Sequence, residues 1–162
     1  MELLHTRNSL ESNAKTTVIA LLNTHVADGI DLALMTKHAH WNLKGPQFIA
    51  VHEMLDRFRA EIDGHVDTMA ERIVQLGGVA QGTARTISQH SRLKSYPANL
   101  VSVHEHIAAL EERYGDIANS LRAAIDTADS AGDKGTADIF TAASRSLDKA
   151  LWFLEAHTIN KA

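Results

Sequence analysis

Apolar residues recur at intervals of three and four along four long stretches of the chain. The stretches run from about residue 12 to 37, from 47 to 76, from 97 to 131 and from 136 to 157. This spacing puts the apolar side chains on one face of an α-helix, so we predict four amphipathic helices. Their predicted core stripes are Ile19, Leu22, Val26, Ile30 and Ala33; Val51, Leu55, Phe58, Ile62, Val66, Met69 and Ile73; Leu100, Val103, Ile107, Leu110, Tyr114, Ile117 and Leu121; and Ile139, Ala143, Leu147, Leu151 and Leu154.

Glycine and proline separate the four stretches. Gly45 and Pro46 end the first, the Gly-Gly pair at positions 77 and 78 stops the second, and Gly132 and Gly135 precede the fourth. Pro97 is expected at or near the first position of the third helix, where proline is favoured. A short extra helix is expected near residues 84–88, in the connection of about 20 residues between the second and third helices. Because each helix must bury one apolar stripe, the fold class is all-α, a four-helix bundle.

The composition narrows the classes of function. A chain of 162 residues is expected to form one domain, with residues 1–11 as an N-terminal tail. It has no cysteine, which excludes disulfides, thiolate zinc sites and thiol catalysis. The net charge of −4 argues against a dedicated nucleic-acid binder. No signal-peptide pattern opens the chain and no apolar run approaches 18 residues, so a cytoplasmic location without a membrane is expected. Ten histidines are many for this length and first indicate metal.

The second predicted helix carries two pairs of metal-ligand residues, His52 with Asp56 and Asp67 with Glu71. Residues four apart share a helix face, so each pair is placed to hold one cation. With His52 at zero and roughly 100° per residue, Asp56 lies at about 40°, Asp67 at about 60° and Glu71 at about 100°. All four therefore occupy one arc beside the core stripe. The same spacing also fits an ordinary solvated helix face, and the pattern alone leaves both interpretations open.

The two pairs are too far apart to serve one ion within a chain. Asp56 and Asp67 are separated by roughly 16 Å along a helix axis, whereas metal–ligand bonds are about 2.0–2.6 Å. A two-fold axis near the middle of the helix solves this problem, because the antiparallel helix of a second subunit would bring Asp67 and Glu71 to His52 and Asp56. His40 would add a fifth ligand if the chain turns back after the first helix. Imidazoles and carboxylates without thiolate favour iron or manganese over structural zinc.

Three segments, at residues 38–42, 48–56 and 67–72, closely resemble the Dps family, which are mini-ferritins of the ferritin-like superfamily. The spacing His-x11-His-x3-Asp-x10-Asp-x3-Glu carries most of this resemblance. It implies a ferritin-like fold, a hollow homo-dodecamer with tetrahedral symmetry, and inter-subunit ferroxidase centres that take up to two iron ions. His40, His52 and Asp56 would come from one subunit, with Asp67 and Glu71 from its partner. The implied activity is oxidation of Fe(II) by hydrogen peroxide and storage of ferric mineral, which would protect DNA from oxidative damage.

Three residues near these ligands have two interpretations each. Trp41 would take up a stray oxidising equivalent, or act as an aromatic anchor at an interface. Lys37 and Asp63 would support the ligands from outside the coordination sphere, or form plain salt bridges. Sequence alone leaves these alternatives open.

Acidic residues gather around the last predicted turn. Three copies around a three-fold axis would form a negative funnel that draws in Fe(II), and Asp138 is the strongest candidate for it. The alternative is a solubilising loop in which Asp138 caps the fourth helix. The acidic residues are Asp126, Asp129, Asp133 and Asp138.

DNA binding is not expected, although the resemblance points to a family named for it. Members that condense DNA often use a lysine-rich N-terminal extension, whereas Arg7 and Lys15 are the only cations here before the core of the first helix. Two alternative functions remain at this point. One is a nucleoid protein that condenses DNA and has a purely structural metal site, and the other is a zinc-bridged bundle without turnover.

Overall fold

The computed structural model describes residues 3–158, and this part of the chain is built from helices. No strand occurs within residues 3–158, apart from an isolated β-bridge between Lys44 and Ser102. The structure therefore confirms the all-α prediction. The five helices are α1 (Ser12–Asn42), α2 (Phe48–Gln75), α3 (Ala84–His90), α4 (Val103–Ser130) and α5 (Lys134–Thr158).

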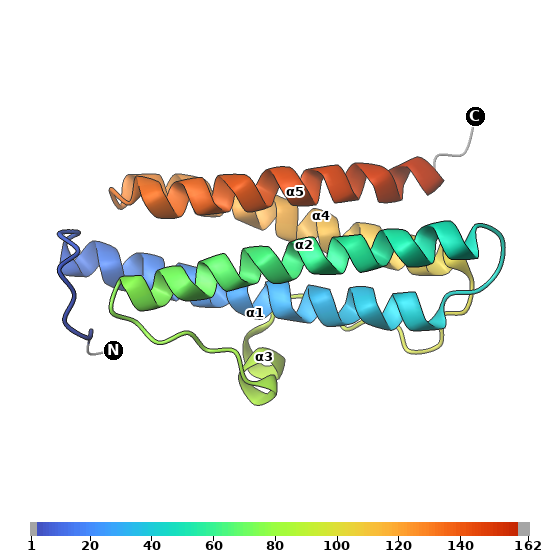
Figure 1. Ribbon diagram of the computed structural model, residues 1–162, viewed down its shortest axis with the longest axis horizontal. Helices are drawn as coiled ribbons and strands as arrows, with labels where there is room; N and C mark the ends of the chain where they lie inside the picture. Colours follow the sequence, from blue (N-terminus) through green and yellow to red (C-terminus); the bar gives the residue numbers. More distant parts are fainter. Residues whose placement is uncertain (1–2, 159–162) are drawn as a thin grey trace.

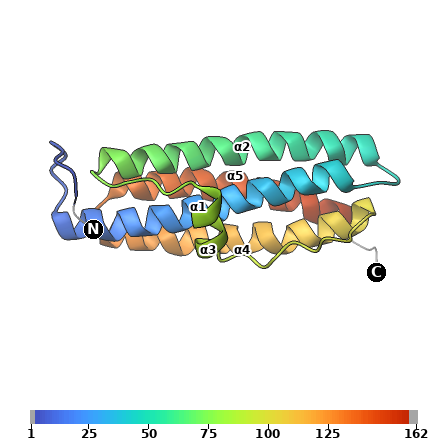
Figure 2. The same ribbon diagram turned by 90° about the horizontal axis from the view of Figure 1, so that it is seen from below.

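The four long helices form two antiparallel hairpins that pack side by side (Figures 1 and 2). α1 packs chiefly on α2, and α4 packs chiefly on α5. A long connection runs back along the bundle between α2 and α4. It carries α3, which lies against the outer side of α1. α2 and α4 consequently run in the same direction, an arrangement that needs a crossover of this length.

The core lies along the stripes that the sequence predicts. The side chains of Leu22, Leu55, Tyr114 and Phe140 are essentially inaccessible to solvent. Predicted members near the stripe edges, such as Ile30, are half-buried. Among the described helices, α1 is long and apolar enough to cross a membrane by length and composition, although no such run was expected. Some 61% of its most apolar 18-residue window is buried within the bundle, as is typical of a helix that contributes to a protein core.

α4 begins at Val103, so the predicted start at Pro97 is wrong. Ser102 and Glu105 form a capping box, in which the Ser102 hydroxyl accepts from the Glu105 amide at 3.2 Å. The Glu105 carboxylate in turn accepts from the Ser102 amide at 2.9 Å. Such a reciprocal cap satisfies two amides that the helix leaves free. Ser102 also pairs with Lys44 in the β-bridge. The Lys44 amide donates to the Val101 carbonyl at 2.9 Å, and the Lys44 carbonyl accepts from the Val103 amide at 3.0 Å. This contact ties the α1–α2 turn to the start of α4.

The helix ends around α1 and α5 also differ from the expected positions. α1 continues five residues past Lys37 to Asn42, so His40 and Trp41 are helical. α5 begins at Lys134 rather than Thr136. The residue that caps it is Asp133, whose carboxylate accepts from the Thr136 amide at 3.0 Å. The predicted alternative that Asp138 caps this helix is therefore wrong.

Candidate metal centre

His40 and His52 form two reciprocal hydrogen bonds where α1 ends and α2 begins. The Nδ1–H of His40 donates to the His52 carbonyl at 2.9 Å, and the Nδ1–H of His52 donates to the His40 carbonyl at 2.9 Å. The two rings stack with centroids 3.5 Å apart. Because a carbonyl only accepts, each Nδ1 carries a proton, and in the neutral ring this leaves the lone pair on Nε2. A histidine oriented in this way by a backbone carbonyl is prepared to bind a metal through Nε2.

Asp56 lies one turn beyond His52 on α2, beside this histidine pair. Its carboxylate is 3.3 Å from His40 Nδ1, and it accepts a hydrogen bond of 2.5 Å from the Lys37 ammonium. The hydrogen bond from Lys37, with the nearby imidazoles, holds the pKa of Asp56 below its ordinary value. Three predicted ligands of one chain are thus together at one end of the bundle, and the carboxylate stays ionised.

The other two predicted ligands lie elsewhere. Asp67 and Glu71 are exposed near the opposite end of α2, and the fold does not bring them to His52. Within residues 3–158, no group of three or more acidic or histidine side chains is arranged to enclose an ion. The predicted ligands of each chain therefore form two separate groups, one toward each end of α2.

Lys37, Asp63 and Trp41, the three residues predicted near the ligands, differ in their contacts. Lys37 contacts the predicted ligand Asp56 directly, and its ammonium also lies 5.9 Å from the Trp41 ring centroid. Trp41 is 68% exposed, which is unusual for so large an apolar side chain. Asp63 accepts from Arg59 at 2.7 Å within α2, and thus forms the plain salt bridge named as its alternative role.

The four acidic residues of the last turn divide into separate roles. Asp133 is 4% exposed and binds the Arg72 guanidinium at 2.8 Å, so its carboxylate is occupied inside the fold. Burial alone would raise its pKa, but hydrogen bonds from Thr136 and the charge of Arg72 lower it overall. Asp129 pairs with Lys134 at 2.5 Å. Asp126 and Asp138 are exposed, so Asp138 stays the residue on which the predicted funnel depends.

Arg72 is a feature that the sequence patterns did not reveal. It follows Glu71 directly on α2 and joins that helix to the start of α5, because its side chain also donates to the Thr136 hydroxyl at 3.2 Å. Nothing in the spacing of α2 distinguishes this arginine from a solvated one. Only the packing of α5 beside α2 shows its role.

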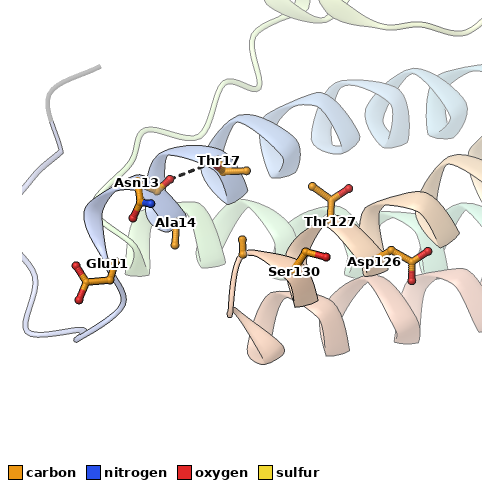
Figure 3. A pocket seen from close by; sticks show the side chains of 8 residues that line it. Glu11, Asn13, Ala14, Thr17, Asp126, Thr127 and Ser130 are labelled. Atoms are coloured by element: carbon orange, nitrogen blue, oxygen red, sulfur yellow. Dashed lines mark hydrogen bonds between the residues drawn. The ribbon is translucent and has the colours of Figure 1, made fainter.

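An open hollow of about 640 Å³ lies where α1 begins and α4 ends (Figure 3). Short polar side chains line it, including Glu11 and Thr17 on one side and Asp126 and Ser130 on the other. It sits at the opposite end of α1 from His40. The hollow is therefore separate from the histidine pair.

The described part of the N-terminal tail, residues 3–11, folds back onto the bundle. The Leu4 amide donates to the Gly77 carbonyl at 2.8 Å, and a side chain at position 77 would collide with the Leu4 carbonyl. Lys15 is only 8% exposed, and its ammonium donates to the Asn8 carbonyl at 2.6 Å. Of the two cations noted in this region, Arg7 alone remains exposed.

The fold is that of a ferritin-like protein, and residues 19–161 match the ferritin-like domain. Proteins of this class typically bind iron. A DNA protection during starvation protein from Agrobacterium fabrum is 62% identical over 157 residues, covering 97% of each chain. The solved tetragonal form of Mycobacterium smegmatis Dps superposes with a TM-score of 0.92 at 33% identity, covering 96% of this chain and 94% of that one. DpsA14 from Streptomyces coelicolor superposes with a TM-score of 0.91 at 34% identity, covering 97% of this chain and 94% of that one.

The chain belongs to the Dps family of ferritin-like proteins.

Proposed function

We propose that this protein oxidises Fe(II) with hydrogen peroxide at centres shared between two subunits, and stores the ferric product. One observation carries the proposal. His40 and His52 are locked through Nδ1 so that both Nε2 atoms stay available beside the ionised Asp56. The remaining ligands would be the partner's Asp67 and the partner's Glu71. Two imidazoles and three carboxylates suit iron and leave coordination positions open for an oxidant.

The surface of α2 supports this sharing independently of the ligands. Positions 52 and 71, like positions 56 and 67, are placed symmetrically about residues 61 and 62. Ile49 and Val74 are symmetric about the same point, and they are 61% and 60% exposed. On the wheel that starts at His52, they lie at about 60° and 40°, within the ligand arc. A two-fold axis through this point would bury both apolar side chains against the partner as it completes both centres.

The chemistry follows from pairing two Fe(II) with one peroxide. Two Fe(II) donate one electron each, the O–O bond breaks, and with two protons the products are two Fe(III) and two water molecules. Because both electrons are delivered together, hydroxyl radical is not released. Three carboxylates stabilise the higher charge of Fe(III) more than that of Fe(II), which favours the oxidised product.

The proposed assembly is a dodecamer built from these dimers, as the similarity to solved Dps structures supports. Fe(II) would pass toward its interior along a funnel that includes Asp138, and ferric mineral would accumulate there. We place the protein in the bacterial cytoplasm or nucleoid, where removal of iron and peroxide would protect DNA.

The two alternative functions have less support. A DNA-condensing role needs free cations, whereas Lys15 is buried and the described tail residues are packed on the bundle. A purely structural zinc bridge would ordinarily use a closed set of four ligands, often with thiolates. The proposed centre instead has five candidate ligands and no thiolate.

The proposal is tested by mixing the assembled apoprotein with Fe(II) and hydrogen peroxide under anaerobic conditions. Ferric absorbance should rise faster than in protein-free solution, with two Fe(II) consumed for each peroxide. The Glu71→Ala assembly should lose the fast phase while keeping its size. Equal rates with and without protein, or one Fe(II) consumed per peroxide, would refute the proposed activity.

A further inference from the structure

The chain has two tyrosines, and they differ in what accepts their phenolic protons. Tyr114 is fully buried, and its hydroxyl lies 3.0 Å from that of Thr36. The Thr36 hydroxyl already donates to the Leu32 carbonyl at 2.8 Å, so Tyr114 is the donor of the pair. A threonine hydroxyl accepts a hydrogen bond but is not a base that takes up a proton at neutral pH. Tyr114 therefore has no proton acceptor at its oxygen.

Tyr96 instead donates to an imidazole. His106 Nε2 lies 3.2 Å from the Leu100 carbonyl, which only accepts, so Nε2 carries the proton and Nδ1 has a free lone pair. The Tyr96 hydroxyl is 2.9 Å from that Nδ1. Burial, together with the nearby His38, lowers the pKa of His106, while burial raises the pKa of Tyr96. At neutral pH the pair is a protonated phenol facing a neutral imidazole.

The surroundings of Tyr96 favour oxidation only if the proton leaves with the electron. The Arg113 guanidinium lies 5.5 Å from the Tyr96 ring centroid, where its charge opposes a positive charge on the ring. Transfer of the phenolic proton to His106 Nδ1 leaves the oxidised ring neutral, which avoids that repulsion. Arg113 is itself held by a bond of 2.7 Å to the Ser95 carbonyl, so the arrangement is fixed.

The pair is also close to the metal-binding end of α1. The Tyr96 and His38 rings form a T-shaped contact with centroids 5.4 Å apart, and His38 is two residues before the proposed ligand His40. Trp41 and Tyr96 line the same open groove, of about 570 Å³, between α1 and the connection to α4. Tyr96 therefore lies beside the same end of α1 as His40, in a groove that it shares with His38 and Trp41.

We propose that Tyr96 and His106 form a redox site that takes up single oxidising equivalents escaping from iron chemistry. A hydroxyl radical would accept one electron from Tyr96 and leave as hydroxide, while the phenolic proton moves to His106 Nδ1. The products are a neutral tyrosyl radical and a protonated imidazole. A further Fe(II) then returns one electron to the phenoxyl oxygen, the proton moves back, and Fe(III) is formed. The source of the oxidant rests on the proposed function, whereas the redox capacity of the pair does not.

The ability of Tyr96 to be oxidised is tested without iron, by flash-quench oxidation of the intact assembly with photogenerated tris(bipyridine)ruthenium(III). The wild-type protein should give a tyrosyl radical by electron paramagnetic resonance, and the radical should form more slowly in D2O. Tyr96→Phe keeps the ring between His106 and Arg113 and should lose the signal. Tyr114→Phe is the matched control and should keep both the signal and its isotope effect. An undiminished tyrosyl signal in Tyr96→Phe, or its loss in Tyr114→Phe alone, would overturn the assignment.

A second arm uses Fe(II) and peroxide with a spin trap for hydroxyl radical. Tyr96→Phe should oxidise Fe(II) at the wild-type initial rate but release more trapped radical. If Fe(II) oxidation is absent in the wild type, the proposed function is refuted. The ruthenium experiment still tests whether Tyr96 forms the tyrosyl radical. If oxidation is normal and radical release is the same in both proteins, Tyr96 does not serve this role.

Discussion

Mixing two inactive variants should restore activity if the metal centres are shared between subunits. His52→Ala removes a ligand from one half of each centre, and Glu71→Ala removes a ligand from the other half, so each homomeric assembly should be inactive. In a mixed dimer, one centre receives both defects and the other receives neither. With equal amounts and random pairing, about half of the dimers are mixed, so about one quarter of all centres should be intact. We therefore expect about one quarter of the wild-type initial rate.

The matched control places both substitutions in one chain and mixes that double variant with wild type. If centres are shared, only wild-type dimers have intact centres, and the rate is again about one quarter. If each centre belonged to one chain, this mixture would give about one half and the first mixture none. Equality of the two mixtures is thus the signature of sharing.

The assay is the initial rise of ferric absorbance after Fe(II) and peroxide are added to subunits reassorted by joint unfolding and refolding. Subunits with different affinity tags allow mass spectrometry to count mixed dimers. No recovered activity in dimers shown to be mixed would refute the shared site, and so would a rate of one half in the control mixture.

Four further predictions follow from individual side chains. Lys37→Met frees Asp56 from its ammonium and should tighten the first Fe(II) binding step, by up to about fivefold if the pair contributes about 0.2–1 kcal/mol. Asp138→Asn should slow uptake at low Fe(II) and reduce its salt dependence, because the funnel acts by electrostatic steering. Burial lowers the pKa of His25 in the fold, so stability should fall as the pH drops below about 6.5, where the unfolded chain binds more protons; thermal unfolding should show a smaller fall in His25→Gln. The proposed shell should not retard plasmid DNA at about 0.15 M salt, because twelve subunits of −4 would carry −48, and among the described tail residues Arg7 is the exposed lysine or arginine.

Matched variants at positions outside the proposed sites serve as controls for the substitutions at Lys37, Asp138 and His25. Lys94 also pairs with a carboxylate, that of Glu112, so Lys94→Met should leave Fe(II) binding unchanged, and an equal effect in both variants would remove the special role of Lys37. Asp116→Asn neutralises an exposed acid elsewhere and should not slow uptake; unchanged kinetics in Asp138→Asn would exclude the funnel. His90→Gln, at an exposed position, should keep the full acid dependence of stability. Tight, salt-sensitive retention of DNA would show that the surface binds phosphates, and a lysine-rich extension should otherwise create that activity.

The helices and the ligand arc were predictable because their causes are local. A repeat of about 3.6 residues places Val51, Leu55 and Ile62 on the core face, and the same repeat places Asp56 and Asp67 beside it. Neither statement needs the position of any other helix. The absence of thiolates, which narrows the choice of metal, is likewise a property of the composition.

Helix ends and side-chain partners were less predictable, because distant segments decide them. Proline at position 97 is favourable at the start of a helix. α4 nevertheless begins only after the capping box at Ser102, because the Val101 backbone is hydrogen-bonded to Lys44. Asp133 resembles the other acids of its turn until α2 brings Arg72 against it.

The four amphipathic helices follow from the sequence alone. So does the conclusion that the two predicted ligand pairs of α2 cannot serve one ion within a chain, because helical rise sets the distance between Asp56 and Asp67. The orientation of the two histidines depends on the tertiary structure. Only the turn between α1 and α2 brings the His40 and His52 backbones close enough for each carbonyl to fix the other imidazole. The structure also gives Tyr96 a base and Tyr114 none, because the connection before α4 folds onto His106, whereas α4 packs Tyr114 against Thr36 of α1. Neither contact follows from the helical repeat.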